Sequence, residues 1–250
     1  MNLRTMQLLN DGHVEVMGDP SPVEVVEGLH DGPAILVTGH DMVDLRNLLE
    51  QTAGRGINVY THGEMLPAHM YKKLRAYPHL RGHYGGAWQK QREEFERFGG
   101  AILATTTCVL IPRETNTCLP RLFTTRVTAV PGATRLTTDD LRPVIEKALE
   151  LGPVKATSRR KSTIGFHYTA ILGIADHIVE AVKEGRVKHF YLVGDCDGAE
   201  PGRNYFHEFA GAAPQDSLVL TLGCGKYRIR EQEFGTLRLN GMEVPRLLDM

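Results

Sequence analysis

The stretch AILVTGHDMVDLRNLLEQT, residues 34–52, decides the fold of this chain. Residues 34–38 form a continuous apolar run of strand length. Residues 42–52 carry apolar side chains at helical spacing, namely Met42, Leu45, Leu48 and Leu49. Asp41 stands where a helix N-cap is expected, and glycines follow the last helical residue. A strand that leads directly into an amphipathic helix predicts one βα unit of an α/β domain.

The same alternation of strand and helix runs through the rest of the chain. We predict further strands at residues 57–60, 101–106, 122–127, 190–193 and 218–222. We predict further helices at residues 87–98, from Asp139 or Asp140 to about residue 151, at residues 169–184 and near residues 205–212. Strands that alternate with helices predict an α/β fold with parallel sheets and helices on their faces.

The pattern predicts two α/β domains. Residues 1–32 are mixed and turn-rich and are expected to be a connector, and residues 33–162 are expected to form the first domain. Residues 154–162 are predicted to be a surface linker at its end. Residues 163–250 are expected to be the N-terminal part of a second domain, because two clear strands precede the apolar run at residues 247–250. An abrupt end would leave a sheet edge and face uncovered, so we expect a fragment of a longer protein or a chain that a partner completes.

Composition favours a soluble globular protein. The 250 residues are 42% hydrophobic and 24% charged with a formal net charge of -1, so no strong field favours nucleic acid or an anionic membrane. No apolar stretch approaches the roughly 20 residues that cross a bilayer, and the first residues lack a signal-peptide core, so a cytoplasmic location is expected. Four cysteines without a CxxC motif favour metal binding or catalysis over disulfides.

Five potential metal ligands each follow a strand-like apolar run. They are His40, Glu64, Cys108, Cys196 and Cys224. Because open α/β sheets build their sites outside the carboxyl ends of their strands, this repetition predicts one metal site assembled from several loops. Thiolates favour iron–sulfur clusters, copper(I) or zinc, whereas imidazole and carboxylate suit iron that keeps positions open for substrate.

Each candidate also has a structural alternative. A buried cysteine is commonly a small apolar residue, and the polar loop around Cys118 favours that role for it. Glu64 can simply stabilise a helix N-terminus, and His62 is an alternative ligand to it. Asp41 can orient His40 or cap the helix that follows, and these two roles compete.

Six segments resemble the hybrid cluster protein (prismane, hydroxylamine reductase) family over essentially the whole chain. They are ILVTGHDMVDL, VYTHGEMLPAHMY, GHYGGAWQKQREEF, ILATTTC, LVGDCDGAEPGRNYF and LTLGCGKYR. The resemblance implies Rossmann-like three-layer αβα lobes. It implies that all five candidates bind a hybrid 4Fe-2O-2S iron–sulfur–oxygen cluster, with Cys196 and Glu64 catalytic and a persulfide on Cys196. Glu64 separates the family from the related carbon monoxide dehydrogenases, which place a cysteine in the comparable role.

The resemblance also implies parts that this sequence lacks. They are an N-terminal helical domain with a conventional iron–sulfur cluster, to which residues 1–32 would connect, and a further cysteine, glutamate and lysine. Asp195 stands where the family usually has glycine, and a carboxylate there can shift the cluster potential through its charge.

The function implied by the resemblance is reduction of small nitrogen oxides. The expected reaction reduces hydroxylamine to ammonia or nitric oxide to nitrous oxide. A redox protein would supply the electrons. A homo-oligomer is one possible state of the protein. No nucleic acid or membrane partner is expected, and this chain alone is expected to be almost inactive. Alternatives are a non-enzymatic fragment or module with an empty metal site, a zinc or mononuclear iron protein using Cys196, Cys224 and His40, and a carbon monoxide dehydrogenase-like protein.

Overall fold

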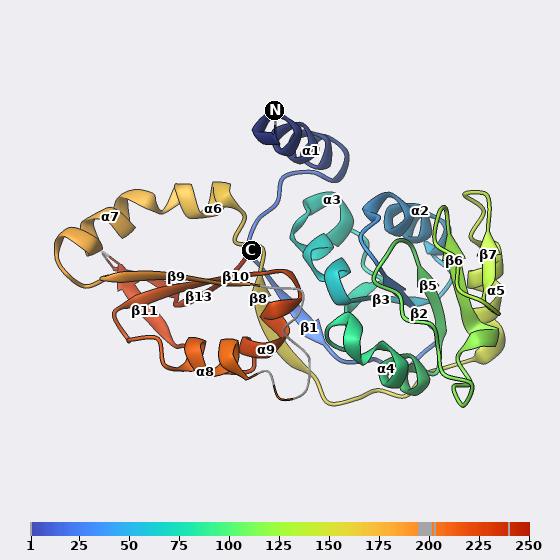
Figure 1. Ribbon diagram of the computed structural model, residues 1–250. Coiled ribbons are helices and arrows are strands. Elements are labelled where there is room, and N and C mark those ends of the chain that lie inside the picture. Colours follow the sequence, from blue (N-terminus) through green and yellow to red (C-terminus); the bar gives the residue numbers. More distant parts are fainter. Residues whose placement is uncertain (1, 195–201, 203, 240) are drawn as a thin grey trace. The chain divides into compact units, whose positions relative to one another are not determined.

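The computed structural model describes residues 2–194, 202, 204–239 and 241–250, and it has the predicted α/β fold (Figure 1). The chain divides into two compact units. The first comprises residues 1–20 and 25–162, and the second comprises residues 21–24 and 163–250. Within the described part of the chain, the longest helices are too short and too polar to cross a bilayer.

The first unit is built on a large, mostly parallel sheet. Its eight strands are β1 (Val23–Glu27), β2 (Ala34–Thr38), β3 (Asn58–His62), β4 (Leu80–His83), β5 (Ala101–Ala104), β6 (Leu122–Thr125), β7 (Thr134–Leu136) and β8 (Arg160–Ile164). They lie in the order β7-β6-β5-β2-β3-β4-β1-β8, and the pairs from β7 through β1 are parallel. The chain therefore builds outward from β2 in one direction, then returns to β2 and builds in the other.

Helices cover both faces of this sheet. One apolar cluster joins Ile35 and Val37 of β2 to helices α2 (Met42–Thr52) and α5 (Arg142–Leu151). Leu36 of β2 instead belongs to a second cluster with helix α4 (Gln91–Phe98). Because alternate residues of a strand point to opposite faces, the all-apolar run that begins at Ala34 buries both faces at once.

Several elements of the first unit were missed by the sequence prediction. Residues 1–32, expected to be a connector, include the helix α1 (Asn2–Met17) and the strand β1. Only Met17 of α1 is buried, and the apolar residues Leu3, Met6 and Leu9 on this helix are exposed. The predicted surface linker at residues 154–162 overlaps the strand β8. The sequence of β8 is mostly polar and gives no apolar signal for a strand.

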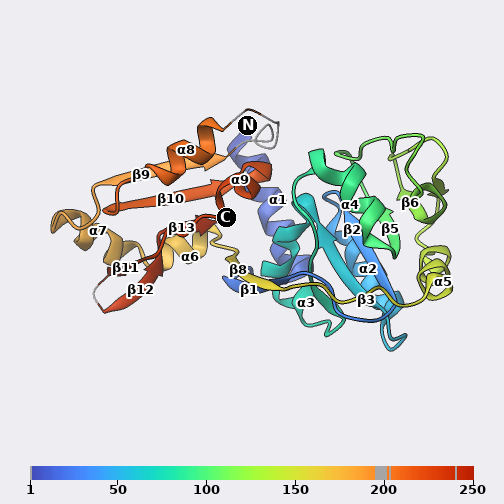
Figure 2. The ribbon, with the colours of Figure 1, turned by 90° about the horizontal axis from the view of Figure 1, so that it is seen from below.

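The second unit has a smaller parallel sheet with helices on both faces. Strands β9 (His189–Gly194), β10 (Ser217–Leu222) and β13 (Leu247–Asp249) lie in the order β13-β10-β9. Helices α6 (Tyr168–Gly173) and α7 (Ala175–Lys183) lie on one side, and α8 (Tyr205–Gly211) and α9 (Lys226–Ile229) lie on the other (Figure 2). A hairpin of β11 (Thr236–Leu239) and β12 (Met242–Pro245) completes the unit.

One expectation for the second unit needs correction, and a second is met in part. The single helix predicted at residues 169–184 is broken at Ile174, directly after Gly173, a residue that weakens helices. The apolar run at residues 247–250 is a strand, as expected, and apolar clusters lie on both faces of its sheet, although Phe190 and Leu192 of β9 remain exposed. One apolar cluster contains Ile178 and Leu218, and a separate cluster contains Val219 and Ile229.

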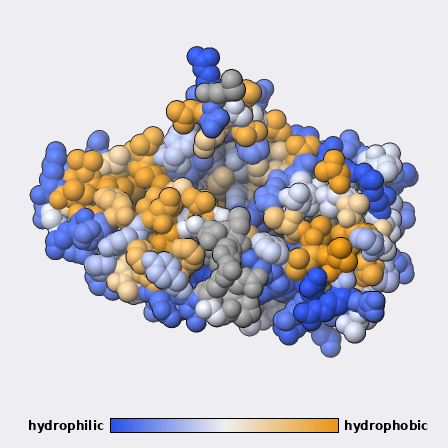
Figure 3. Space-filling model, in the orientation of Figure 1, coloured by the Kyte–Doolittle hydropathy of each residue, from blue (hydrophilic) through white to orange (hydrophobic). Residues whose placement is uncertain are grey.

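The second unit also exposes apolar side chains. Those on α6, α7 and β9 include Leu172, Val179, Val182, Phe190 and Leu192, and Figure 3 shows hydrophobic residues gathered over this part of the surface. Contiguous exposed apolar surface is uncommon on a monomeric soluble protein.

Arg121 ties the end of α4 to the sheet. Its buried guanidinium donates hydrogen bonds to the carbonyl oxygens of Gly100 at 2.7 Å, Phe95 at 2.5 Å and Glu96 at 3.1 Å. The last turn of a helix leaves its carbonyl groups without intrahelical partners, so Arg121 supplies donors that the helix cannot.

We expect Arg121→Met to lower the free energy of unfolding by about 2–4 kcal/mol, because several buried carbonyl groups lose a charged donor. Arg121→Lys should recover only part of the loss, since one ammonium cannot reproduce the planar fork. Chemical denaturation measures both values. Arg97→Met, on the exposed side of α4, is the control and should change the value by less than about 0.5 kcal/mol. Equal effects at the two positions would contradict this role for Arg121.

Candidate metal centre

The candidate site of the first unit lies where the strand order reverses. β2 has β3 on one side and β5 on the other, so the loops that leave β2 and β5 run in opposite directions. Ligands of open α/β sheets bind in the crevice outside such a switch point. His40 follows β2 and Cys108 follows β5, so two of the predicted ligands lie in the loops that leave these two paired strands.

His40 is exposed, and its ring is held by a threonine. The backbone N–H of His40 donates to Thr106 Oγ1 at 2.7 Å, and the ring Nδ1 lies 3.1 Å from the same oxygen. A metal-binding histidine usually gives its second ring N–H to a protein oxygen. With Nδ1 engaged by Thr106, Nε2 is the ring nitrogen that suits a metal.

Asp41 caps the helix and does not orient His40. Its Oδ1 accepts hydrogen bonds from the backbone N–H groups of Val43 at 2.9 Å and Asp44 at 3.0 Å. Its Oδ2 pairs with Arg126 Nε at 3.1 Å. Of the two roles that the sequence allowed for Asp41, the structure therefore shows the helix N-cap and not the orientation of His40.

Gly39 allows the two loops to approach each other. Its φ of 106° lies in a region that favours glycine. A Cβ added there would lie 2.5 Å from Thr105 Oγ1 and 2.7 Å from Thr106 Oγ1. The TGH segment therefore needs glycine so that the threonines before Cys108 can reach the His40 backbone.

The loop after β3 separates the roles of His62 and Glu64. His62 is fully buried, with Nδ1 at 3.1 Å from Thr38 Oγ1 and Nε2 at 2.8 Å from Glu94 Oε2. Both ring nitrogens are therefore used within the protein, which argues against His62 as the alternative ligand. Glu64 is partly exposed in the first turn of the 3-10 helix Gly63–Met70.

The cysteines occupy different surroundings. Cys108 is exposed and has a φ of 62°, one of two non-glycine residues with positive φ in the described chain. Cys224 is buried in the second unit, in the turn Gly223–Gly225 that directly follows β10. Cys118 is buried in an apolar cluster, and burial raises the pKa of its thiol, which fits the structural role expected for it. Cys196 and Asp195 lie outside the described residues.

The donor set can be compared with the cluster that the resemblance implies. Among the residues that the structure describes, no three His, Cys, Asp or Glu side chains gather around a single point. His40, Glu64 and Cys108 instead follow three adjacent strands, which lie about 4.8 Å apart in a sheet. The chemistry of the donors, imidazole, carboxylate and thiolate, suits iron.

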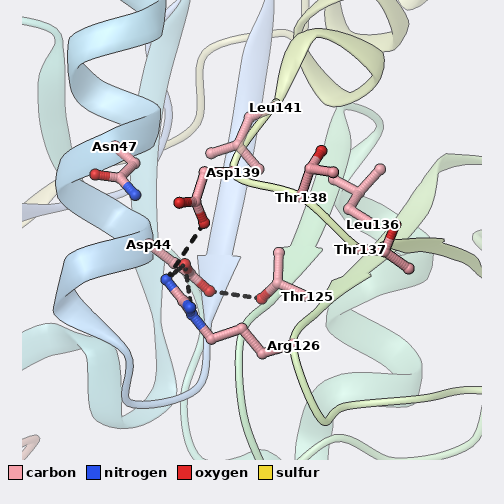
Figure 4. Close-up of a pocket in the computed structure, with 9 residues that line it drawn as sticks. All are labelled: Asp44, Asn47, Thr125, Arg126, Leu136, Thr137, Thr138, Asp139 and Leu141. Atoms are coloured by element: carbon pink, nitrogen blue, oxygen red, sulfur yellow. Dashed lines mark hydrogen bonds and ion pairs between the residues drawn. The ribbon is translucent and has the colours of Figure 1, made fainter.

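Two cavities lie near these loops. One of about 280 Å³ opens beside His40 and is lined by His13, Met17, His40, Asp41, Met42, Val43 and Thr106. The other, about 50 Å³, is shown in Figure 4, where Arg126 pairs with Asp44 and Asp139, and Thr125 donates to Asp44. Burial is the main cause that raises the pKa of Asp44, and the contacts with Thr125 and Arg126 oppose it. This polar cluster supports the start of α2, next to His40.

Known proteins resemble this chain along its whole length. The sequence profile of the Prismane/CO dehydrogenase family matches residues 1–250. The chain is 54% identical over 250 residues to a hydroxylamine reductase of Moorella thermoacetica, spanning 100% of the chain and 57% of that protein. It is 50% identical over 252 residues to that of Solidesulfovibrio magneticus, spanning 100% of the chain and 46% of that protein. It is 47% identical over 250 residues to the hydroxylamine reductase of Methanothermobacter thermautotrophicus, spanning 100% of the chain and 57% of that protein. The chain spans about half the length of the curated relatives it matches.

We expect Gly39→Ala to destabilise the first unit by about 2–4 kcal/mol, because the methyl group overlaps the threonine hydroxyls in a backbone conformation that already disfavours alanine. Gly54→Ala is the matched control, since Gly54 has a φ of 72° but no atom within 4 Å of an added Cβ. Its cost should be about 1 kcal/mol. Chemical denaturation of both variants decides the point, and equal losses would contradict the close approach.

The buried His69 predicts acid sensitivity. It lies in the same 3-10 helix as Glu64, with Nε2 2.9 Å from Thr61 Oγ1, and burial lowers its pKa from 6.5 to about 4. As the pH falls through 6.5, the unfolded chain gains a proton that the folded chain does not. Stability is therefore lost between about pH 6.5 and 4, by up to about 3 kcal/mol.

His69→Gln, which does not titrate, should flatten the dependence of the unfolding free energy on pH over this range. Denaturation curves from pH 7.5 to 4.5 measure it for both proteins. Parallel curves would show that His69 is not the source.

Proposed function

Because this chain belongs to the Prismane/CO dehydrogenase family, we propose that it provides part of a hybrid-cluster oxidoreductase that reduces small nitrogen oxides. The substrate is hydroxylamine, reduced to ammonia, or nitric oxide, reduced to nitrous oxide. The proposal rests on one observation: His40 and Cys108 lie in the loops that leave the two paired strands at the strand-order reversal, in a chain whose relatives are named hydroxylamine reductase. An electron-donating redox protein, a homo-oligomeric state and a cytoplasmic location are further parts of the proposal.

In this proposal five side chains hold the hybrid iron–sulfur–oxygen cluster. His40 binds through Nε2, Glu64 through its carboxylate, and Cys108, Cys196 and Cys224 through thiolates, with Cys196 as the persulfide position. When bound, the cluster supplies electrons and an open iron position for the N–O group. The chain's own part is to orient these donors. Thr106 holds the His40 ring, while Thr38 and Glu94 keep His62 out of the ligand set.

Reconstitution tests this function. We expect the chain, purified without oxygen and supplied with iron and sulfide, to bind both and to show an electron paramagnetic resonance signal. His40→Ala, Glu64→Gln, Cys108→Ser and Cys224→Ser should each lower iron retention by at least about tenfold. Cys118→Ala is the matched control, because it removes a buried thiol that the proposal does not use.

The activity assay follows hydroxylamine consumption and ammonia formation. We expect little or no turnover by the 250-residue chain alone, and turnover that depends on the same ligands in a protein of the relatives' length. A chain that contains equimolar zinc and no acid-labile sulfide would contradict the proposal that it binds an iron–sulfur cluster. Substantial turnover by the isolated chain would overturn the expectation that it needs more of the protein.

A further inference from the structure

Gln91, the first residue of α4, forms an amide bridge to the loop that carries Cys108. Its Nε2 donates to the carbonyl oxygen of Cys108 at 2.6 Å, and its Oε1 accepts from the backbone N–H of Leu110 at 2.9 Å. Gln91 is only 1% exposed. A buried amide with both ends satisfied by one loop fixes that loop, because breaking either hydrogen bond would leave a buried polar group without a partner.

The bridge begins at a residue with a strained backbone. Cys108 has a φ of 62°, which residues with a Cβ rarely adopt. Strained conformations persist only where the surrounding structure over-determines them, and they cluster at functional sites. The amide bridge fixes the carbonyl group that follows the φ torsion of Cys108. The hydrogen bonds of Thr105 to Thr38 and of Thr106 to His40 fix the chain before it, so the torsion is held from both sides.

The bridge also reaches the strand that precedes His40. Gln91 Nε2 lies 3.4 Å from Thr38 Oγ1, at the end of β2, and the same hydroxyl lies 3.1 Å from His62 Nδ1. A single buried side chain thus connects the loop of Cys108 to the strand ends that precede His40 and Glu64.

We infer that Gln91 is a positioning residue that holds the Cys108 backbone in the conformation from which its thiolate binds iron. This inference rests on the proposed function, because it takes Cys108 as a ligand. It goes beyond that function because it states that Gln91, a residue of α4, sets the backbone conformation of this ligand. Gln91 acts through the loop and is not itself a ligand.

The chain contains a matched control for this bridge. Gln51, in the last turn of α2, donates from Nε2 to the carbonyl oxygen of Asp139 at 2.8 Å and accepts at Oε1 from the N–H of Leu141 at 2.9 Å. The chemistry and the two-residue spacing are the same, but that loop carries no predicted ligand. Gln51→Met therefore removes a bridge of the same kind from a loop that holds no predicted ligand.

The first test uses the metal-free 250-residue chain and measures denaturation midpoints. Cys108→Gly removes the Cβ that conflicts with positive φ. Its effect on stability should therefore be more favourable in the parent chain, where Gln91 holds the loop, than in the Gln91→Met background, where the loop can relax. In the Gln51→Met background the effect of Cys108→Gly should equal that in the parent chain. An identical effect of Cys108→Gly in all three backgrounds would overturn the claim that Gln91 holds the strained conformation.

The second test uses the chain reconstituted with iron and sulfide. Gln91→Met should weaken iron retention against a chelator by about tenfold and alter the electron paramagnetic resonance signal, whereas Gln51→Met should leave both unchanged. Gln91→Glu is a second variant in case the apolar side chain impairs folding. It keeps an acceptor for Leu110 but loses the donor to Cys108, so it should show the same change.

The outcomes separate this inference from the proposed function. If Cys108→Ser leaves iron retention and the signal unchanged, Cys108 is not a ligand and the proposed function fails at that residue. If Cys108→Ser changes them but Gln91→Met and Gln91→Glu behave like Gln51→Met, the positioning role alone is overturned.

Discussion

The reversal of strand order beside β2 is the constraint on which the candidate site depends. β3 and β4 are added on one side of β2, and β5, β6 and β7 on the other. The loops that leave β2 and β5 are consequently directed apart, which opens a crevice at the carboxyl ends of two paired strands. His40 and Cys108 follow those strands, and Glu64 follows the neighbouring β3. Their common location thus arises from topology, before any side-chain contact is considered.

Hydroxyl and amide groups then hold the first residues of these loops in place. Thr105 and Thr106 bond the backbone around His40, and Gly39 leaves room for them. Gln91 holds the backbone of Cys108. These groups are neutral and sit at or beside the buried strand ends, where they can be satisfied without the cost of burying a charge. Asp41, the charged residue next to His40 in the sequence, is occupied by its helix and by Arg126.

Parts of the fold with a strong local signal could be predicted. The strand Ala34–Thr38 and the helix Met42–Thr52 were predicted with the bounds that the structure shows, because a buried parallel strand is apolar throughout and an amphipathic helix repeats its apolar residues. The strands β4, β7 and β8 have three to five residues with mixed polarity and no such signal. Thr106 and Gln91 could not be selected from sequence, since a threonine or glutamine in a polar segment is ordinary until its partner is known.

The sequence by itself determined the α/β class, the βα unit at residues 34–52 and the recurrence of metal-ligand residue types after apolar runs, because these depend on periodicity and on neighbours along the chain. Only the tertiary structure decided which strands are adjacent, that Asp41 also pairs with Arg126, that His62 is used internally and that Gln91 reaches Cys108. These outcomes depend on contacts between residues 17 to 85 positions apart, such as Gln91 with Cys108 and Asp41 with Arg126. Such contacts form only when the sheet brings distant segments together, so no local pattern records them.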